Sequence, residues 1–540
     1  MTRIRMVCMF AGAVVMLAMP ALAGDREALP LPDLNGPAKA ASPGQKSDPM
    51  AGSLSGALEA LAEADNEPER KDRDALRRFY AARGYSGLWI SAAGLNLKAE
   101  ALTAELAAAD SYGLSARDFK LPGAVTSASG PEKLAAAELQ LSIAALTYAR
   151  DARGGRIADP AGMLSTNLDR RPQWLEPQTV LEGLAKADDP AVFLRGLQPK
   201  HVQFERLRLL YVAEIAKSGR KGSLSAAAKH LRANMEMWRW MPDDMGTKEP
   251  LKDGKLAAGM YVLNNIPEFM QYVYRDGVVI RSEKIVAGKV DKQSSIFSRP
   301  LKYVVLRPMW RVPESIKVNE LWPSLLRGGG IMRKFGLQVE TKDGEPVDWH
   351  KINWVKADIR DYEVTQPPGP ASALGHVKFS FPSQHTIYMH DTPDKWMFGA
   401  AKRTLSHGCL RVRNPMALAE MILKEDKGWD AGKIAELDSS GPLNNEIAID
   451  KRIPIHLVYF TAWVDEPGKL KSFADVYGHE KRVTLALDGQ WDKIDKGRDH
   501  LAPVEQSFNP AAVALNAPKR AAAKQAASAD FFSDPFGLGW

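Results

Sequence analysis

The 540-residue sequence contains little cysteine, few aromatic residues and little excess charge. It has only two cysteines, Cys8 and Cys409, which excludes a disulfide-rich secreted scaffold. The net charge is +7, and no block of Lys and Arg is interleaved with aromatic residues, so a nucleic-acid partner is not expected. Apart from one N-terminal run, no stretch is apolar enough to cross a bilayer. With 45% hydrophobic residues, the chain can still bury about two or three cores.

The N-terminus has the pattern of a secretory signal peptide. Arg3 and Arg5 precede an apolar run over residues 6–22, which ends in the small-x-small tripeptide Ala21-Leu22-Ala23. The run is shorter than the roughly 20 apolar residues of a spanning helix, which disfavours an uncleaved anchor. We therefore expect residues 1–23 to be a signal peptide and the mature protein to lie outside the cytoplasm.

Cleavage at that point would remove Cys8 and leave Cys409 as a lone thiol. A lone thiol cannot form an internal disulfide, and in an oxidising compartment it is exposed to oxidation and mispairing. Its presence suggests that the thiol has a chemical role. The alternative is a buried cysteine that acts as a small hydrophobic residue.

The composition then divides the chain into regions. Residues 24–65 are rich in Pro, Gly, Ala, Ser and charge, which is typical of a disordered tether. Residues 66–235 contain segments with apolar residues at three- and four-residue spacing, such as 97–114, where Gly113 is placed to end a helix. This pattern predicts a mainly helical domain over residues 66–235.

The next region predicts a β-rich domain over residues 256–465. Short runs of β-branched and aromatic residues alternate with turns, and Arg275-Asp276-Gly277 between two such runs indicates a hairpin. Residues 314–374 interrupt the pattern with a helical stretch and a Gly- and Pro-rich loop. An insert of that length is usually functional, and we expect it to cap a site.

The C-terminal part has two predicted segments. Residues after about 460 look like a closing hairpin and helix, and residues 466–500 are predicted to be a C-terminal extension of the scaffold. Residues 501–540 are of low complexity and predicted to be disordered. The aromatic end FFSDPFGLGW is either a docking peptide or a segment without function. The whole chain is predicted to be an α+β multidomain protein.

The residues that suggest chemistry lie within 387–415, which contain His390, His407, Cys409 and Arg411. His390 ends a predicted strand, and Cys409 follows a glycine in a turn. A free thiol titrates near pH 8.5, so it needs a base or a positive field to react at neutral pH. We expect His390 to act as the general base for Cys409, and Arg411 with the turn amides to stabilise the thiolate.

Two neighbouring residues complete the predicted catalytic group. Gly408 allows a sharp turn, so the N–H groups of Gly408 and Cys409 could face an oxyanion. His390 also needs an acceptor for its other ring nitrogen. Asp391 provides two candidates, its backbone carbonyl and its carboxylate.

Other roles remain open for the nearby polar residues. Ser406, His407 and Arg411 are candidates for substrate binding, although His407 could instead shape the turn. An arginine run is usually solvated surface, but one arginine could bind a substrate carboxylate. A zinc site formed by His390, His407 and Cys409 would lack a fourth ligand, so no metal is predicted.

The segment Ser406-His407-Gly408-Cys409-Leu410-Arg411, about 15 residues after His390, resembles the signature of the L,D-transpeptidase (YkuD-type) catalytic domain. The stretches NNIPEFMQYVYRDGVVIRSEKIVAGK, LRPMWRVPESI and ALGHVKFSFP resemble the large YcbB-like branch of that family. LRRFYAARGYSGLWI near the N-terminus resembles the scaffold domain of that branch. The resemblance covers about residues 70–490.

By this resemblance, Cys409 attacks the carbonyl between the third and fourth residues of a peptidoglycan stem tetrapeptide, releases D-Ala and forms a thioester. An amine of another stem then resolves the thioester to a 3-3 cross-link in cell wall biogenesis. The resemblance also implies a periplasmic location, a capping role for residues 314–374, acylation by carbapenems and no cofactor. Other cell-wall synthesis proteins are possible partners.

The sequence departs from that branch in one respect. Members usually carry a peptidoglycan-binding domain between the helical and catalytic domains, but LRLLYVAEI here runs almost directly into AKHLRAN. Alternatives are a non-catalytic wall-binding scaffold, or a hydrolase-like or sortase-like use of the thiol. Sortases disperse His, Cys and Arg widely, and papain-like enzymes place Cys before His. The acyl acceptor, which decides between cross-linking, protein attachment, D-amino acid exchange and hydrolysis, is not specified by the residues.

Overall fold

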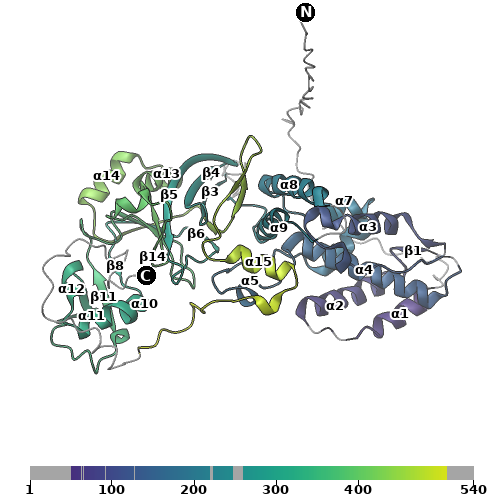
Figure 1. Ribbon diagram of the computed structural model, residues 1–540, viewed down its shortest axis with the longest axis horizontal. Helices are drawn as coiled ribbons and strands as arrows, with labels where there is room; N and C mark the ends of the chain where they lie inside the picture. The colour runs from purple at the N-terminus through teal and green to yellow at the C-terminus, as the bar shows by residue number, and fades with distance from the viewer. Residues whose placement is uncertain are drawn as a thin grey trace, which may run out of the picture. The chain divides into compact units, whose positions relative to one another are not determined.

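The computed structural model describes residues 50–506, apart from positions 63, 65, 92 and 127 and the ranges 219–222 and 247–258 (Figure 1). The predicted signal peptide, most of the tether and residues 507–540 lie outside the described residues. In the part of the chain that is described, no helix has the length and apolar character needed to span a membrane.

The first part of the chain is helical, as predicted, with α4 at its centre. Helix α4 contacts α1, α2, α3, α6 and α7, and the buried side chains of these helices share one core. Asn66 and Asn96 cap α2 and α3 by accepting from the N–H groups of Glu69 and Ala99. The helices are α1 (Ala51–Glu59), α2 (Glu67–Ala82), α3 (Leu97–Ala107), α4 (Pro131–Gly154), α5 (Pro160–Met163), α6 (Pro177–Lys186), α7 (Pro190–Arg195), α8 (Val202–Ser218) and α9 (Ala226–Arg239), with a hairpin of β1 (Ile90–Ser91) and β2 (Gly94–Leu95).

Two local expectations in this region have clear outcomes. Gly113 ends the turn that follows α3 with a left-handed φ of 71°, as its position predicted. The tether predicted over residues 24–65 is wrong for Ala51–Glu59, which form α1. Leu54 and Leu58 of this helix lie four residues apart, are buried, and belong to the core that contains α4. A single pair of apolar residues four positions apart was not enough to predict a helix in this otherwise polar segment.

The second part of the chain is β-rich, as predicted. An 11-stranded sheet in the described residues has the order β16-β7-β12-β13-β15-β5-β4-β3-β17-β6, with β14 paired to β5. Asp276 and Gly277 have φ of 50° and 74°, which is the turn geometry expected for the β4–β5 hairpin. The strands are β3 (Met260–Asn265), β4 (Met270–Arg275), β5 (Val278–Gly288), β6 (Ser298–Pro300), β7 (Tyr303–Leu306), β12 (Val377–Ser380), β13 (Met389–His390), β14 (Thr404–Ser406), β15 (Leu410–Val412), β16 (Asn445–Ala448) and β17 (Pro454–Val458). The helices α13 (Pro415–Lys427) and α14 (Ala431–Ser440) lie between β15 and β16 in the chain.

The insert over residues 314–374 has more structure than the predicted helix and loop. It forms short helices, and three of its strands join β8 in a sheet of order β10-β9-β11-β8 with its own buried core. Its strands are two to five residues long, which is too short for alternation to show in the sequence. The elements are β8 (Trp310–Arg311), α10 (Glu314–Ile316), a π-helical turn (Lys317–Leu321), α11 (Trp322–Leu326), α12 (Gly330–Phe335), β9 (Gln338–Thr341), β10 (Pro346–Val347) and β11 (Tyr362–Gln366).

The C-terminal elements return to the helical region. The hairpin of β18 (Ala462–Val464) and β19 (Leu470–Ser472) is followed by α15 (His479–Leu487), which packs on α9. Asp488 binds Lys229 of α9 at 2.7 Å. The disordered tail predicted from residue 501 begins too early, because the Gln506 side chain accepts from the N–H of Ile359 at 2.9 Å and holds this segment on the insert.

Helix α9 is joined to the β-rich region by a buried asparagine. The Asn234 side chain accepts from the N–H groups of Thr461 and Ala462 at 2.9 and 3.0 Å. It also donates to the Thr461 hydroxyl at 2.9 Å. Trp238, one turn further along α9, stacks on Phe460 with ring centroids 4.1 Å apart. All of these side chains are buried, so the contact excludes water.

We predict that Asn234→Ala destabilises this junction by about 2 kcal/mol or more, because it leaves two buried N–H groups without an acceptor. Urea unfolding followed by tryptophan fluorescence measures the effect. Lys229→Ala on the same helix is the matched control, since its partly exposed ion pair contributes about 1 kcal/mol or less. Equal midpoints for the two variants would contradict the role of Asn234.

Candidate active site

Strand register brings the predicted catalytic residues together. His390 of β13 pairs with Arg411 of β15 in parallel and with Lys378 of β12 in antiparallel register. Side chains at paired positions lie on the same face of a sheet, and so do side chains two residues apart along a strand. Tyr388 and Cys409 therefore lie on the same face as His390. Five chemically active side chains share one surface, although they come from three strands.

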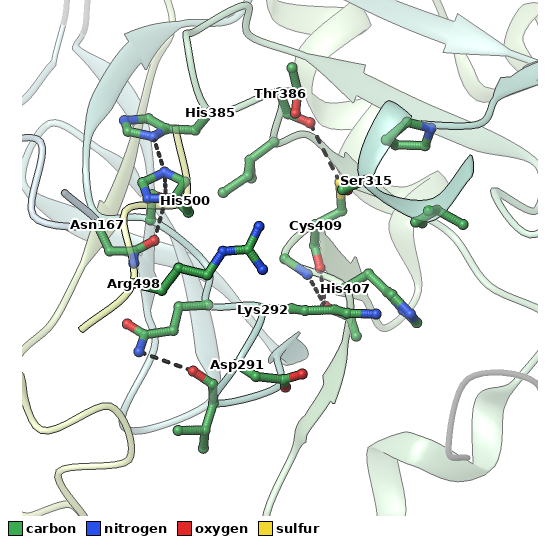
Figure 2. A pocket seen from close by; sticks show the side chains of 18 of the residues that line it. Asn167, Asp291, Lys292, Ser315, His385, Thr386, His407, Cys409, Arg498 and His500 are labelled. Atoms are coloured by element: carbon green, nitrogen blue, oxygen red, sulfur yellow. Dashed lines mark hydrogen bonds between the residues drawn. The ribbon is translucent and has the colours of Figure 1, made fainter. Parts of the chain in front are cut away.

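This surface opens into a cavity of about 640 Å³ (Figure 2). Cys409, His390, Tyr388 and His407 are among its lining residues. The Cys409 thiol is partly exposed, and its sulfur lies 3.9 Å from the carbonyl oxygen of Thr386. The thiol is therefore accessible to a molecule in the cavity.

Thr386 was not identified from the sequence. Its φ of 51° lies in the left-handed region, which β-branched residues rarely adopt. The surrounding structure therefore holds the backbone in a costly conformation where its carbonyl meets the thiol.

His390 is buried and has the tautomer that a general base requires. Its Nδ1–H donates to the backbone carbonyl of Asp391, which leaves the lone pair on Nε2. Burial, with the nearby charge of Arg411, lowers the pKa of His390 to about 3, so the ring is neutral. No hydrogen bond joins the imidazole to the Cys409 thiol within the described residues, although both line the cavity.

The two candidates for orienting His390 are thereby resolved. The backbone carbonyl of Asp391 holds the ring, and the carboxylate has other partners. That carboxylate forms an ion pair with Lys395 and accepts from the N–H of His376 at 3.1 Å. It fixes the loop that follows His390.

The surroundings of the thiol act in opposite directions on its acidity. Burial raises the pKa of Cys409 to about 11, whereas hydrogen bonds from Tyr388 and the charges of Lys378 and Arg411 lower it. The Lys378 ammonium also lies 4.7 Å from the centroid of the Tyr388 ring. Tyr388 and Lys378 were missed in the sequence. Tyr388 had one usable signal, its place two residues before His390 in the same predicted strand.

The turn that carries Cys409 depends on glycine, as predicted, because Gly408 has a φ of 116°. The Ser406 hydroxyl accepts from the Gly408 N–H at 3.2 Å and donates to the Cys409 carbonyl at 2.6 Å. The Gly408 carbonyl accepts from the Ser294 hydroxyl at 2.6 Å.

These bonds change two expectations. The Gly408 N–H, expected to face an oxyanion, is already bonded inside the turn. Ser406, expected to bind substrate, uses its hydroxyl to close the same turn. The backbone N–H of Cys409 has no acceptor among the described residues, so it is the turn amide that remains available to an oxyanion.

His407 connects the turn to the insert. Its Nε2 lies 2.7 Å from the Glu320 carboxylate, which also pairs with Lys292. Although burial opposes ionisation, the hydrogen bond from His407 and the charge of Lys292 lower the pKa of Glu320 to about 2. Of the two roles left open for His407, this contact favours shaping the turn.

Arg411 is not solvated surface, because only 1% of its side chain is exposed. It lies on the cavity wall and binds the Asp394 carboxylate at 3.2 Å, and burial lowers its pKa to about 10. Arg403 is also buried and donates to the carbonyls of Ile285 and Phe269. The expectation of a solvated arginine run is therefore wrong at these two positions. A buried charge close to the thiol can stabilise its anion, and it is less accessible to a substrate carboxylate.

The zinc alternative has no support in the part of the chain that is described, where no group of three or more His, Cys, Asp or Glu side chains could hold a metal ion. Nδ1 of His390 and Nε2 of His407 both face oxygen atoms of the protein.

Comparisons with known proteins give two domain-family matches within this chain. Residues 74–209 match the Scaffold domain family, and residues 259–429 match the L,D-transpeptidase catalytic domain family. A Haemophilus influenzae protein named "Putative L,D-transpeptidase" is 33% identical over 240 residues, which are 44% of this chain and 47% of that protein. The chain therefore spans about half the length of this relative.

A solved structure, that of Mycobacterium tuberculosis L,D-transpeptidase 1, matches over 37% of this chain and 62% of that chain, with 12% identity and a TM-score of 0.16. The family assignment rests on the two domain matches and the curated relative. Residues 259–429 belong to the L,D-transpeptidase catalytic domain family of the YkuD type, preceded by an N-terminal Scaffold domain, as the sequence predicted.

Proposed function

We propose that this protein is a cysteine transpeptidase that acts on peptidoglycan stem peptides and uses Cys409 as its nucleophile. The observation that carries the proposal is the strand register, which puts His390 and Cys409 on one face at the wall of a large cavity. The family match and the partly exposed thiol support the same reading. The donor is a stem tetrapeptide, cleaved between its third and fourth residues.

In the first step, the Cys409 side chain rotates from the Thr386 carbonyl towards His390, and Nε2 takes the thiol proton as sulfur attacks the substrate carbonyl. The C–S bond forms while the Cys409 N–H and the Tyr388 hydroxyl donate to the oxyanion. The C–N bond then breaks, and D-Ala leaves with the proton held by His390. The product is a thioester on Cys409.

In the second step, a side-chain amine of a diaminopimelate residue on another stem attacks the thioester. His390 accepts the amine proton and returns it to sulfur, so an amide forms and the thiol is restored. The result is a 3-3 cross-link. Water in place of the amine would give hydrolysis, and a carbapenem would acylate the same thiol.

The remaining assignments follow from this chemistry. The substrate lies in the cell wall, so we propose that residues 1–23 direct export to the periplasm. The Scaffold domain, together with partner proteins, would supply the wall recognition that a separate binding domain provides in the large branch. The cavity binds the stem, and the insert over residues 314–374 caps it.

We predict that Cys409→Ala abolishes product formation from disaccharide-tetrapeptide and that the wild-type protein accumulates a substrate thioester on Cys409, both measured by mass spectrometry. An unchanged melting temperature for the variant shows that it still folds. If no thioester or Cys409-dependent product forms while binding to sacculi persists, the protein is a non-catalytic scaffold. If products form equally in the variant, Cys409 is not the nucleophile.

Thiol reactivity should rise about tenfold for each pH unit below the Cys409 pKa of about 11, because only the thiolate reacts with iodoacetamide. We predict that Tyr388→Phe raises this pKa further and slows alkylation about tenfold at a fixed pH, since it removes a hydrogen bond to the thiolate. Tyr303→Phe on β7, outside the cavity wall, is the control. Equal alkylation profiles for all three proteins would exclude a role for the Tyr388 hydroxyl.

We predict that Ser406→Ala lowers kcat at least about tenfold with little change in KM, because the turn loses two hydrogen bonds that position Cys409. Steady-state release of D-Ala measures both constants. A rise in KM at constant kcat would instead support the original expectation that Ser406 binds substrate.

A further inference from the structure

The wall of the cavity away from Cys409 includes a segment that the proposed reaction does not use. Residues 488–506, called here the C-terminal strap, run from the end of α15 to the insert, where Gln506 binds the N–H of Ile359. Lys496, Arg498 and His500 of the strap line the same cavity as Cys409. A segment far from the catalytic motif in the chain thus forms part of the substrate cavity.

The strap is fixed at His500 by contacts with three other segments. One ring nitrogen of His500 lies 3.0 Å from the Thr166 hydroxyl, and the other lies 2.7 Å from His385 and 3.2 Å from the Ser295 hydroxyl. His385 in turn contacts Asp169 at 3.0 Å, and its side chain is fully buried. A residue with this many partners holds its neighbours in a defined position.

Arg498, two residues before His500, extends from the strap into the cavity towards the side that carries Cys409 (Figure 2). It forms no hydrogen bond or ion pair with any other described residue. The other cations of the cavity wall are engaged: Lys292 with Glu320, Arg411 with Asp394, Arg482 with the carbonyls of Tyr477 and Asp495, and Lys496 with the carbonyl of Gly162.

The charge of the cavity favours an anionic ligand. Among the described lining residues, Asp291 is the acidic one, and five lining residues are Lys or Arg. Because the other four have partners inside the protein, Arg498 is the cation best placed to bind a ligand. A guanidinium binds carboxylates through two parallel hydrogen bonds, which gives both affinity and orientation.

We infer that Arg498 binds a carboxylate of the stem peptide and thereby determines which stems are accepted, an inference that rests on the proposed function. Two carboxylates flank the bond to be cleaved: the C-terminal carboxylate of the fourth residue and the side-chain carboxylate of the diaminopimelate at the third. Both carboxylates lie within a few covalent bonds of the carbonyl that Cys409 would attack, and Arg498 and Cys409 line the same cavity. Arg498 is a binding residue, and His500 positions it.

The test compares wild type with Arg498→Gln and Arg498→Lys on three tetrapeptide donors: unmodified, amidated at the C-terminal carboxyl, and amidated at the third-residue side chain. Arg498→Gln should raise KM for the unmodified donor about ten- to a hundredfold with kcat within about threefold, because a charged hydrogen bond is lost in binding. Arg498→Lys should restore part of the affinity. Lys493→Gln, on the same strap and outside the cavity wall, is the matched control and should behave as wild type.

The amidated donors identify the carboxylate. The donor that lacks the recognised carboxylate should bind weakly to the wild type and be insensitive to Arg498→Gln, whereas the other should remain sensitive. Equal effects of Arg498→Gln on all three donors, or no effect on any, would overturn the inference.

Binding separates this inference from the proposed reaction. In the Cys409→Ala background, titration calorimetry with the unmodified tetrapeptide should show a Kd about ten- to a hundredfold weaker when Arg498→Gln is added. If the wild type forms no thioester but binding still depends on Arg498, the reaction is wrong and the carboxylate site stands. If Arg498→Gln leaves the Kd unchanged, the carboxylate site is refuted, whether or not the thioester forms.

The role of His500 has its own readout. His500→Ala should raise KM for the same donors as Arg498→Gln. The KM of the double variant should be no higher than that of Arg498→Gln alone, because both changes remove the same interaction. Additive effects of the two substitutions would show that His500 acts independently of Arg498.

Discussion

The parallel pairing of β13 with β15 is the contact on which the site depends. Two parallel strands cannot be joined by a tight turn, so residues 391–409 must leave the sheet and return. The return is held by β14, which pairs with β5, and by the glycine turn that Ser406 and Ser294 fix from two sides. The Cys409 thiol therefore lies at the end of a crossover whose last turn is held by hydrogen bonds. A shift of register by one residue would turn Cys409 and His390 away from each other.

This dependence explains what the sequence could and could not predict at the site. His390, Gly408 and Cys409 could be predicted as candidates because each has a local signature, in a strand end, a turn and a lone thiol. Lys378 and Tyr388 were missed because their proximity to the thiol arises from register, which is a property of paired strands and not of one segment. The hydrogen bond between the Gly408 N–H and the Ser406 hydroxyl likewise depends on the folded turn, so it could not be predicted from the sequence. The same holds for Arg411, because its burial cannot be predicted from a run of arginines.

The elements of the fold were also predicted only in part. The helical region and the long β4–β5 hairpin were predicted because their apolar period runs over many residues. Helix α1 and the strands of the insert were missed because each is too short to show a period. Leu54 and Leu58 are buried because α1 packs against α4, which is distant in the sequence. The tail was placed too early for a related reason, since Gln506 is held by hydrogen bonds to the backbone of Ile359 and Ala357 in the insert, which its own segment does not reveal.

Burial of the site also affects the acidity of the Cys409 thiol. Burial raises the pKa of Cys409 to about 11, so the thiol holds its proton at neutral pH more firmly than a free cysteine, whose pKa is about 8.5. Because oxidants react with the thiolate, the environment that keeps the thiol protonated also disfavours its oxidation. His390 is neutral for the same reason, so no thiolate–imidazolium pair forms in advance. In the proposed reaction, proton transfer from Cys409 to His390 would therefore accompany attack on the bound carbonyl, and the thiol would react only when an acyl donor is bound.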